Sequence, residues 1–406
     1  MIWANAVSFV NARVAVGERI AESIRFSSRV LSIGMRPKHG DTVLDLQGGF
    51  VLPGLVNAHD HLELNHYGRI KGRDRYENAS DWISDMEPRL SGDRAIREGR
   101  AHPLIERLFI GGLKNLLAGV TMVAHHNPFY AELRRTMPIR VVRRYGWAHS
   151  FRLEGRPAGA RGEPGGDVAL RCRATPPDTP FVLHLAEGVD ADARGELARL
   201  EALGCLKPNT VIVHGVAIDE DGWRRVARAG GALVWCPASN AFLFGRTAAV
   251  RELLEGRDDA RVTVALGTDS RVTGSLDLLD ELRAARFAVP MAADRLLGMV
   301  TSEAGKLLRQ PRAGRLEVDA PADLVVIPPL AQEPGAALLE ARRRDIRLVV
   351  VGGRPLIGDP DFAAVFQARK VTPRPLQVDA APKLADSGLV RRIAGCPIAE
   401  PGVSVA

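Results

Sequence analysis

The chain has 406 residues, of which 46% are hydrophobic and 25% charged, and its 55 Lys and Arg residues outnumber its 48 Asp and Glu residues. This composition is that of a folded globular protein, and it excludes disordered and collagen-like chains. No run approaches the roughly eighteen apolar residues of a membrane helix. The start, MIWANAVSFVNARV, is too polar for a signal peptide. We therefore expect a cytoplasmic protein with no membrane partner.

The net charge of +7 is spread along the chain. Arginines are scattered and do not cluster beside aromatic residues, so we expect no nucleic-acid partner. The cysteines lie too far apart for a structural zinc or redox motif, and we expect buried, reduced thiols at Cys172, Cys205, Cys236 and Cys396. Assembly into a homo-oligomer stays open.

The strand signal changes character at Phe50. Residues 1–50 alternate apolar and polar residues in short runs, which predicts half-buried antiparallel strands. Solidly apolar runs follow, as in parallel strands buried on both faces. The predicted buried strands are 50–58, 119–124, 139–142, 181–186, 210–215, 231–236 and 262–267.

Helical patterns separate most of these strands. The predicted helices are 97–118, 191–203, 221–229, 247–254, 275–288 and 292–308. Strands that alternate with helices predict a TIM-like (β/α)8 barrel over residues 51–311. Its eighth strand is expected between Ile139 and Asp178, where RRYGWAHSF is the candidate and GRPAGARGEPGG (155–166) is typical of a flexible loop. We therefore expect irregularity at strands three and four.

The chain returns to β character after the barrel. The runs GRLEVDAPADLVVIPP and IRLVVVGGRPLI lie within residues 312–370. Residues 371–406 are expected to form an irregular tail, because prolines recur there at Pro373, Pro375, Pro382 and Pro397.

Chemically active residues end several predicted strands. His59 and His61 end the first strand and, at i and i+2, face the same side. His184, His214 and Asp269 end three later strands, and the carboxyl ends of barrel strands meet on one face. A single strand-end histidine is more often structural than a ligand, but the whole set favours one site for a divalent ion such as Zn²⁺.

These segments resemble a known family. LPGLVNAHDHLE (52–63), HLAE (184–187), VIVHG, VWCPASN (234–240) and ALGTDS (265–270) are similar to motifs of the amidohydrolase superfamily, in its cytosine deaminase, adenosyl-homocysteine deaminase and triazine hydrolase branch. The resemblance implies a small composite β-sandwich of residues 1–50 and 312–370 beside the barrel.

The resemblance also implies the roles of the site residues. His59, His61, His184 and Asp269 would hold one divalent transition metal, zinc or iron, with a water in its open position. Glu187 would carry a proton from that water to the substrate nitrogen, and His214 would stabilise the attacking water or charge on the substrate. Asp269 would additionally accept a proton.

The spacing of lysines bears on the number of metals. Relatives with two metals bridge them by a carboxylated lysine or by a glutamate, and this chain has no lysine between Lys114 and Lys207. A carbamate bridge is thereby excluded and a mononuclear site predicted, although Glu132, Glu154 and Glu163 lie in the same region.

Further polar residues are candidates for substrate contact. The segment 63–86 is long for a barrel loop and predicts a lid or a pocket wall. The candidate residues are His66, Tyr67, Trp82, His126, Asn127, His149, Arg152 and Asn240.

The predicted function is that of a hydrolase in which a metal-bound water attacks a carbon–nitrogen bond other than a peptide bond. The favoured reaction is deamination of a cyclic amidine, such as an aminopurine or aminopyrimidine. Hydrolysis of an amide or carbon–halogen bond is the alternative on the same scaffold. A catalytically inactive scaffold protein is the alternative of another class.

Overall fold

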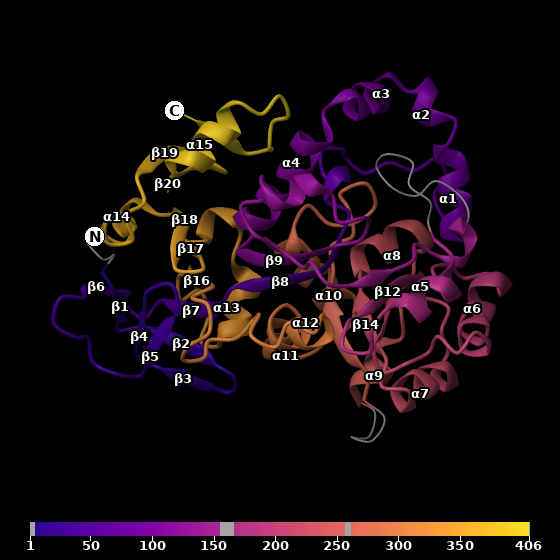
Figure 1. Ribbon diagram of the computed structural model, residues 1–406, viewed down its shortest axis with the longest axis horizontal. Coiled ribbons are helices and arrows are strands. Elements are labelled where there is room, and N and C mark those ends of the chain that lie inside the picture. Colours follow the sequence, from indigo (N-terminus) through magenta and orange to yellow (C-terminus); the bar gives the residue numbers. More distant parts are fainter. Residues whose placement is uncertain (1–4, 155–165, 256–260, 406) are drawn as a thin grey trace.

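The computed structural model describes residues 5–154, 166–255 and 261–405. One region consists of strands covered by helices, and a second region, rich in antiparallel strands, holds both ends of the chain (Figure 1). The predicted flexible loop lies outside the described residues apart from Gly166, as does Glu163. None of the described helices has the length and apolar character that a membrane crossing requires.

Eight short parallel strands form the framework of the first region. They are β8 (Leu55–Asp60), β9 (Val120–His125), β10 (Arg140–Val141), β11 (Gly146–Trp147), β12 (Phe181–Leu185), β13 (Thr210–His214), β14 (Ala232–Trp235) and β15 (Thr263–Leu266). Every residue of β8, β12, β13 and β14 is buried, which explains why their sequences are mostly apolar up to the polar residues near their ends.

These strands pair in chain order. One sheet has the order β10-β9-β8 and another the order β11-β12-β13-β14-β15. A parallel bridge between Asp60 and Asp269 brings the end of β8 beside the segment that follows β15. Within the described residues no ladder joins β10 to β11, so a closed barrel is not formed there. This is the region of strands three and four, where the sequence predicted irregularity.

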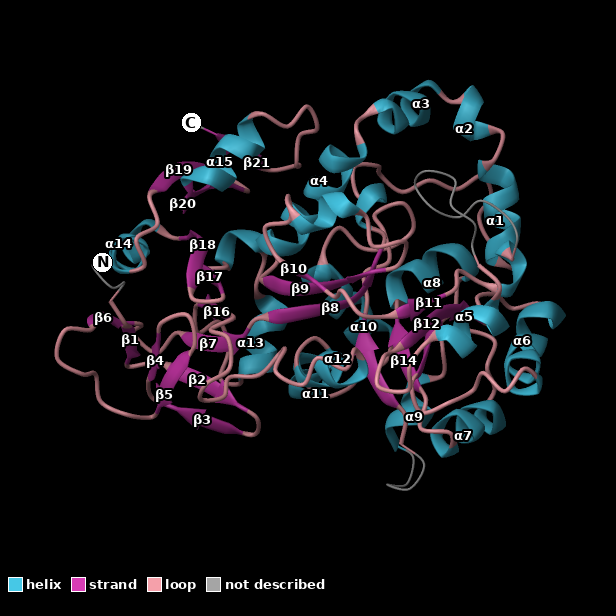
Figure 2. Cartoon of the chain, in the orientation of Figure 1, coloured by secondary structure: helices cyan, strands magenta, loops and turns pink. Residues whose placement is uncertain are grey.

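Helices cover these strands on the outside (Figure 2). They are α1 (Ala79–Met86), α2 (Arg89–Gly92), α3 (Arg94–Ala101), α4 (Leu104–Leu117), α5 (Val168–Ala174), α6 (Ala191–Ala202), α7 (Glu220–Arg228), α8 (Pro237–Phe244), α9 (Val250–Glu255), α10 (Leu278–Ala288), α11 (Ala293–Met299) and α12 (Ser302–Leu307).

Three predicted elements are interrupted. The helix predicted for 97–118 is split into α3 and α4 because Pro103 disfavours a helical residue before it. The helix predicted for 292–308 is likewise split, at a non-helical Thr301 with φ −134° and ψ −105°. The strand predicted for 50–58 is broken at Gly54, where a Cβ atom would lie 2.2 Å from Thr121 Oγ1.

The second region is formed by segments from both ends of the chain. Its strands are β1 (Val7–Val10), β2 (Arg13–Val16), β3 (Arg19–Ala21), β4 (Ile24–Phe26), β5 (Val30–Ile33), β6 (Thr42–Asp45), β7 (Phe50–Pro53), β16 (Leu324–Ile327), β17 (Leu348–Val351), β18 (Arg354–Gly358), β19 (Pro373–Val378), β20 (Ala381–Asp386) and β21 (Val403–Val405). Its helices are α13 (Pro334–Glu340), α14 (Ala363–Ala368) and α15 (Ser387–Ala394).

Two sheets carry these strands, in the orders β5-β4-β1-β6 and β21-β19-β20-β18-β17-β16-β7-β2-β3. Strand β7 pairs antiparallel with β16, so the N-terminal and C-terminal segments share one sheet. An apolar cluster that includes Phe9, Phe26, Leu324 and Phe366 draws on both sheets and both chain segments.

The prediction of an irregular tail at 371–406 is wrong. The segment contains β19, β20, α15 and β21, and it extends the larger sheet. Strand β19 accommodates Pro373 and Pro375 because β21 covers only its last three residues, Leu376 to Val378. Proline is tolerated where one side of a strand has no neighbour to bond.

Candidate metal centre

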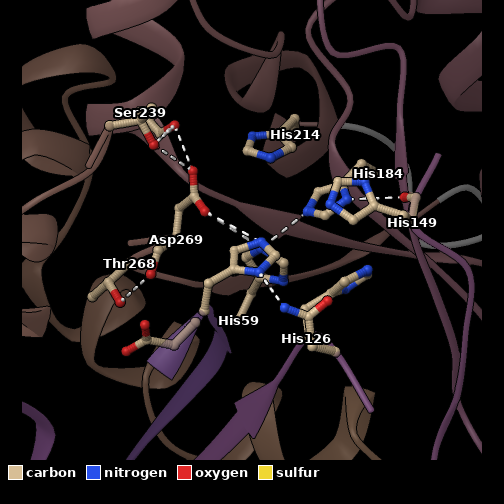
Figure 3. A network of polar contacts seen from close by, with 12 residues as sticks. His59, His126, His149, His184, His214, Ser239, Thr268 and Asp269 are labelled. Carbon is tan, nitrogen blue, oxygen red and sulfur yellow. Dashed lines mark hydrogen bonds and ion pairs between the residues drawn. The ribbon is translucent and has the colours of Figure 1, made fainter. Parts of the chain in front are cut away.

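Histidines from the two sheets meet at the carboxyl ends of the strands (Figure 3). His59 is the last residue but one of β8, and His61 directly follows that strand. His184 lies near the end of β12, His214 ends β13, and Asp269 follows β15. The structure thus brings together five residues that the sequence singled out.

Three of these imidazoles converge on one point. Ligand nitrogens of His59, His61 and His184 lie within 4.8 Å of one another, and no other group of three such ligands occurs among the described residues. His59 Nε2 lies 3.3 Å from His184 Nε2. Asp269 Oδ1 lies 3.6 Å from His61 Nε2 and 3.8 Å from His59 Nε2.

The donor set fits a borderline divalent cation. Burial and the neighbouring imidazoles lower the pKa of His59 and His184 well below the ordinary value, which keeps both rings neutral. Burial alone would raise the pKa of Asp269, but His61, His214 and hydrogen bonds from Thr273 and Ser239 lower it. Neutral imidazoles beside one carboxylate are the ligands that zinc and similar ions prefer.

The polar neighbours of these residues orient them. His184 Nδ1 donates to the carbonyl oxygen of His149 at 2.9 Å, which leaves Nε2 free to face His59. Asp269 Oδ2 accepts hydrogen bonds from Ser239 Oγ at 2.8 Å and from Thr273 Oγ1 at 2.7 Å. The other oxygen, Oδ1, is therefore the one presented to the histidines.

Three of the ten described non-glycine residues with positive φ lie at the same strand ends. Ala186, His214 and Asp269 have φ values of 55°, 72° and 53°. Residues other than glycine rarely adopt this left-handed region and do so where the surrounding structure holds them there. The strain is consistent with a functional role for these positions.

Glu187 and His214 form a pair beside the cluster. His214 Nε2 lies 3.4 Å from Glu187 Oε1, and the Glu187 side chain is 17% exposed. Burial and the carboxylates of Asp269 and Glu196 raise the pKa of Glu187 in the protein alone. A nearby cation would favour the ionised form, so this carboxyl group is suited to exchange a proton.

Helix α8 was not predicted from the sequence, and it supplies two orienting groups. Asn240 Oδ1 accepts a hydrogen bond from His214 Nδ1 at 2.8 Å, and Ser239 contacts Asp269. Asn240 therefore supports His214, although the sequence assigned it to substrate. The helix escaped prediction because its sequence, PASNAFLF, has no polar stripe, although Pro237 at its first turn is a helix-start signal.

His126 and His149 border the cluster. Their ring centroids lie 4.2 and 4.5 Å from that of His184. His126 Nε2 donates to the carbonyl oxygen of Ala148 at 3.2 Å, and Nδ1 of each ring is buried without a partner. Asn127 Nδ2 lies 2.5 Å from Glu63 Oε1 and 3.5 Å from His61 Nδ1. These residues lie close enough to contact a molecule bound at the cluster.

The remaining substrate candidates are engaged elsewhere. His66 Nε2 bonds to the Gly99 carbonyl at 3.1 Å, and Tyr67 bonds to the Ile96 carbonyl at 3.3 Å. Trp82 Nε1 donates to the Ile70 carbonyl at 2.9 Å. Arg152 pairs with Asp192 on the surface. The segment 63–86, expected to be a lid or wall, is fixed by such contacts and contains α1.

A buried polar network behind the cluster was missed by sequence reasoning. Lys114 Nζ donates to Asp60 Oδ2 at 3.1 Å, to Asn65 Oδ1 at 2.8 Å and to Thr268 Oγ1 at 3.1 Å. All four residues are completely buried. The one available signal was Asp60, which stands between His59 and His61 and so faces away from the metal ligands.

A model of the amidohydrolase family matches residues 181–368 of the chain. The 5-methylthioadenosine/S-adenosylhomocysteine deaminase of Natronomonas pharaonis is 29% identical over 370 residues, which span 79% of this chain and 84% of the relative.

Solved structures have a similar fold. Triazine hydrolase from Arthrobacter aurescens has a TM-score of 0.70 and 21% identity, with 87% of this chain and 94% of that chain covered. An adenosine deaminase from Xanthomonas campestris with bound zinc has a TM-score of 0.62 and 19% identity, with coverages of 90% and 97%.

The comparisons confirm the predicted resemblance to the amidohydrolase superfamily and to its deaminases. With triazine hydrolase the chain shares the fold. The predicted enzyme class, a metal-dependent hydrolase acting on carbon–nitrogen bonds other than peptide bonds, is confirmed as well.

Proposed function

Since the chain resembles the amidohydrolases in sequence and fold, we propose that it deaminates a heterocyclic amidine, an aminopurine or aminopyrimidine or a nucleoside of one. The observation that carries the proposal is the Glu187–His214 pair beside the cluster of His59, His61, His184 and Asp269. Hydrolytic deamination needs a nucleophilic water and a group that returns a proton to the departing nitrogen.

We propose one divalent transition ion per chain, with zinc as the favoured metal, held by His59, His61, His184 and Asp269. Support comes from the single group of convergent imidazoles in the described residues and from the zinc bound in the adenosine deaminase neighbour. When bound, such a cation would lower the pKa of water toward neutrality and so supply the nucleophile.

Glu187 is the proposed proton carrier. Its carboxyl group takes a proton as water attacks the ring carbon and returns that proton to the leaving amino group. His214, held by Asn240 with Nδ1 as the donor, presents Nε2 toward Glu187 and the reacting atoms. Asp269, whose Oδ2 is bound by Ser239 and Thr273, is the second proton acceptor.

His126, His149 and Asn127 are the proposed substrate contacts. The unpartnered Nδ1 of His126 accepts a hydrogen bond, because its Nε2 already donates to Ala148. Neutral imidazoles in a buried site suit an uncharged, flat ring with N–H groups. The proposal makes no use of His66, Tyr67, Trp82 or Arg152, each of which has a polar contact away from the cluster.

We further propose that the strands after residue 53 act, up to about residue 311, as a TIM-like (β/α)8 barrel, irregular at strands three and four, with a composite β-sandwich of the segments before residue 54 and after residue 311, including β19, β20 and β21. The strand order and the bridge between Asp60 and Asp269 support this arrangement. It explains why ligands from widely separated segments meet at one end of the strands.

The test is a screen for ammonia release from aminopurines, their nucleosides, aminopyrimidines and triazines. Amides and halogenated triazines are included to test the two alternative reactions, amide and carbon–halogen hydrolysis. Glu187→Gln should retain the metal and lose at least about a hundredfold in kcat. Glu201→Gln is the control, since Glu201 lies on α6 and pairs with Arg225 of α7. Chloride release alone, or turnover that survives Glu187→Gln, would contradict the proposal.

A further inference from the structure

We propose that Glu400, close to the C-terminus, is a positioning residue for the metal centre and acts through Arg271. The inference rests on the proposed metal site but not on the identity of the substrate. It gives the C-terminal segment, residues 395–405, a role in the chemistry of a site formed by residues up to about 340 positions away.

Glu400 and Arg271 form a buried bidentate ion pair. Arg271 Nη1 donates to Glu400 Oε2 at 2.8 Å, and Nη2 donates to Oε1 at 2.6 Å. The Glu400 side chain is 0% exposed and that of Arg271 is 6% exposed. Arg343 also donates to Glu400 Oε1 at 2.8 Å. A buried guanidinium is tolerated only with such a partner, because an uncompensated buried charge is strongly unfavourable.

Arg271 is bound on its other side to the segment that follows β8. Its backbone N–H donates to Asn65 Oδ1 at 3.2 Å, and Nη1 donates to the Asn65 carbonyl at 3.2 Å. Asn65 Nδ2 in turn donates to Asp60 Oδ1 at 2.7 Å. The contacts therefore run from Glu400 to the two segments that carry the ligands, one with His59 and His61 and the other with Asp269.

The segment that holds Asp269 needs this support. Asp269 has a left-handed backbone conformation, and a Cβ atom on Gly274 would lie 2.0 Å from the Thr268 carbonyl oxygen. A strained, tight turn persists only if neighbouring contacts hold it. Arg271 lies two residues after Asp269 and provides such contacts. Its ion pair with Glu400 holds its side chain in the position where it makes them.

A second ion pair attaches helix α15, which directly precedes the C-terminal segment, without reaching the ligands. Arg392 of α15 donates to Glu106 Oε2 of α4 at 2.6 Å. Substitution of Glu106 should loosen the attachment of the C-terminal segment and leave Asn65 and Arg271 in place. It is therefore the matched control for Glu400.

The experiment measures metal affinity in the full-length protein. Wild type, Glu400→Gln and Glu106→Gln are stripped with a chelator, and Zn²⁺ binding is measured by competition with a coloured chelator alongside thermal unfolding of the metal-free forms. Glu400→Gln should weaken Zn²⁺ binding by at least about tenfold, the size seen when groups supporting metal ligands are lost. Glu106→Gln should bind Zn²⁺ as wild type does.

A double variant covers the case in which Glu400→Gln fails to fold. Arg271→Met with Glu400→Met removes both charges of this pair and leaves Arg343 its second carboxylate partner, Asp379, so the fold should survive, while the bonds from the guanidinium to Asn65 are lost. Zn²⁺ binding should again weaken by about tenfold or more, and Glu400→Asp should restore part of the affinity lost in Glu400→Gln.

Each outcome has a defined meaning. Wild-type Zn²⁺ affinity in a folded Glu400→Gln or double variant would overturn the positioning role. Wild-type protein that binds no Zn²⁺ would overturn both this inference and the proposed metal site. Weakened binding in the Glu400 variants, together with no deamination by wild type, would leave the positioning role standing while the proposed reaction fails.

Discussion

The two halves of the metal centre differ in how completely their polar atoms are paired. On the side of β12–β15, His184, His214 and Asp269 each have an orienting hydrogen bond. On the side of β8–β11, several buried atoms have no partner among the described residues. They are His59 Nδ1, Glu63 Oε2, His126 Nδ1, Asn127 Oδ1 and His149 Nδ1.

This difference indicates that the two halves of the metal centre have different roles. Groups with fixed partners resist movement, which suits His184, His214 and Asp269, whereas a buried polar atom left unpaired costs about 1–3 kcal/mol. Such a cost is recovered when a bound molecule supplies the partner. The match to the amidohydrolase family begins at residue 181, the start of β12, so it covers the paired half and not the unpaired one.

The largest effect should come from breaking the paired half at Asp269. Asp269→Ala removes the oxygen that faces His59 and His61, and it leaves Ser239 and Thr273 without their acceptor. Metal content should fall from about one ion per chain to near zero and turnover to background, as elemental analysis and ammonia release would record. Asp280→Ala, on α10, is the control. Two ions per wild-type chain would disprove the mononuclear prediction.

A smaller loss should follow when Asn240 is truncated. In Asn240→Ala the Nδ1–H of His214 loses its acceptor, so the ring is no longer held in one orientation. We expect kcat to fall about ten- to a hundredfold at unchanged metal content. Thr247→Val is the comparison, since Thr247 Oγ1 accepts hydrogen bonds from the Asn240 amide nitrogen and from Trp235 Nε1 and has none with His214. If both substitutions lower kcat equally, Asn240 has no specific role in orienting His214.

A residue of the unpaired half, His149, should make the stability of the protein depend on pH. Burial and the neighbouring His61 lower the pKa of His149 to about 3. Because this folded-state pKa lies below the ordinary 6.5, the unfolded chain binds a proton first as pH falls, and stability is lost from about pH 6.5 downward. Metal-free His149→Gln should lose roughly 2 kcal/mol less unfolding free energy than wild type between pH 7 and pH 5. If both proteins lose the same unfolding free energy between pH 7 and pH 5, His149 is not the source of the loss.

The mildest expected effect is on substrate affinity at His126. His126→Phe keeps an aromatic side chain but removes the unpartnered acceptor and the Nε2 bond to Ala148, so KM should rise about tenfold while kcat changes little. Arg152→Ala, a surface substitution, should alter neither constant. A fall in kcat without a change in KM would move His126 from recognition to chemistry.

The ligands could be predicted from the sequence because they obey local rules. His59 and His61 are two residues apart at a strand end, and His184, His214 and Asp269 end apolar runs of strand length. The resemblance to a family added roles that spacing alone does not give, such as that of Glu187.

The supporting residues could not be predicted, for a physical reason. Lys114, Asn65 and Glu400 are residue types usually found at the surface, and their burial depends on partners up to 206 positions away. Strands β10 and β11 are only two residues long, below the length at which a period can be recognised. The tail was mistaken because proline in a partly uncovered strand resembles proline in a coil.

Transfer of this metal centre to another scaffold would require hydrogen-bond partners for Asp60 as well. Asp60 accepts hydrogen bonds from Asn65, Lys114 and Asn115 on the face of β8 opposite to His59 and His61. A transplanted His-x-His pair would therefore carry a buried anion with it. The graft has to include a lysine and two amides on the neighbouring elements, or replace all four residues together with apolar ones.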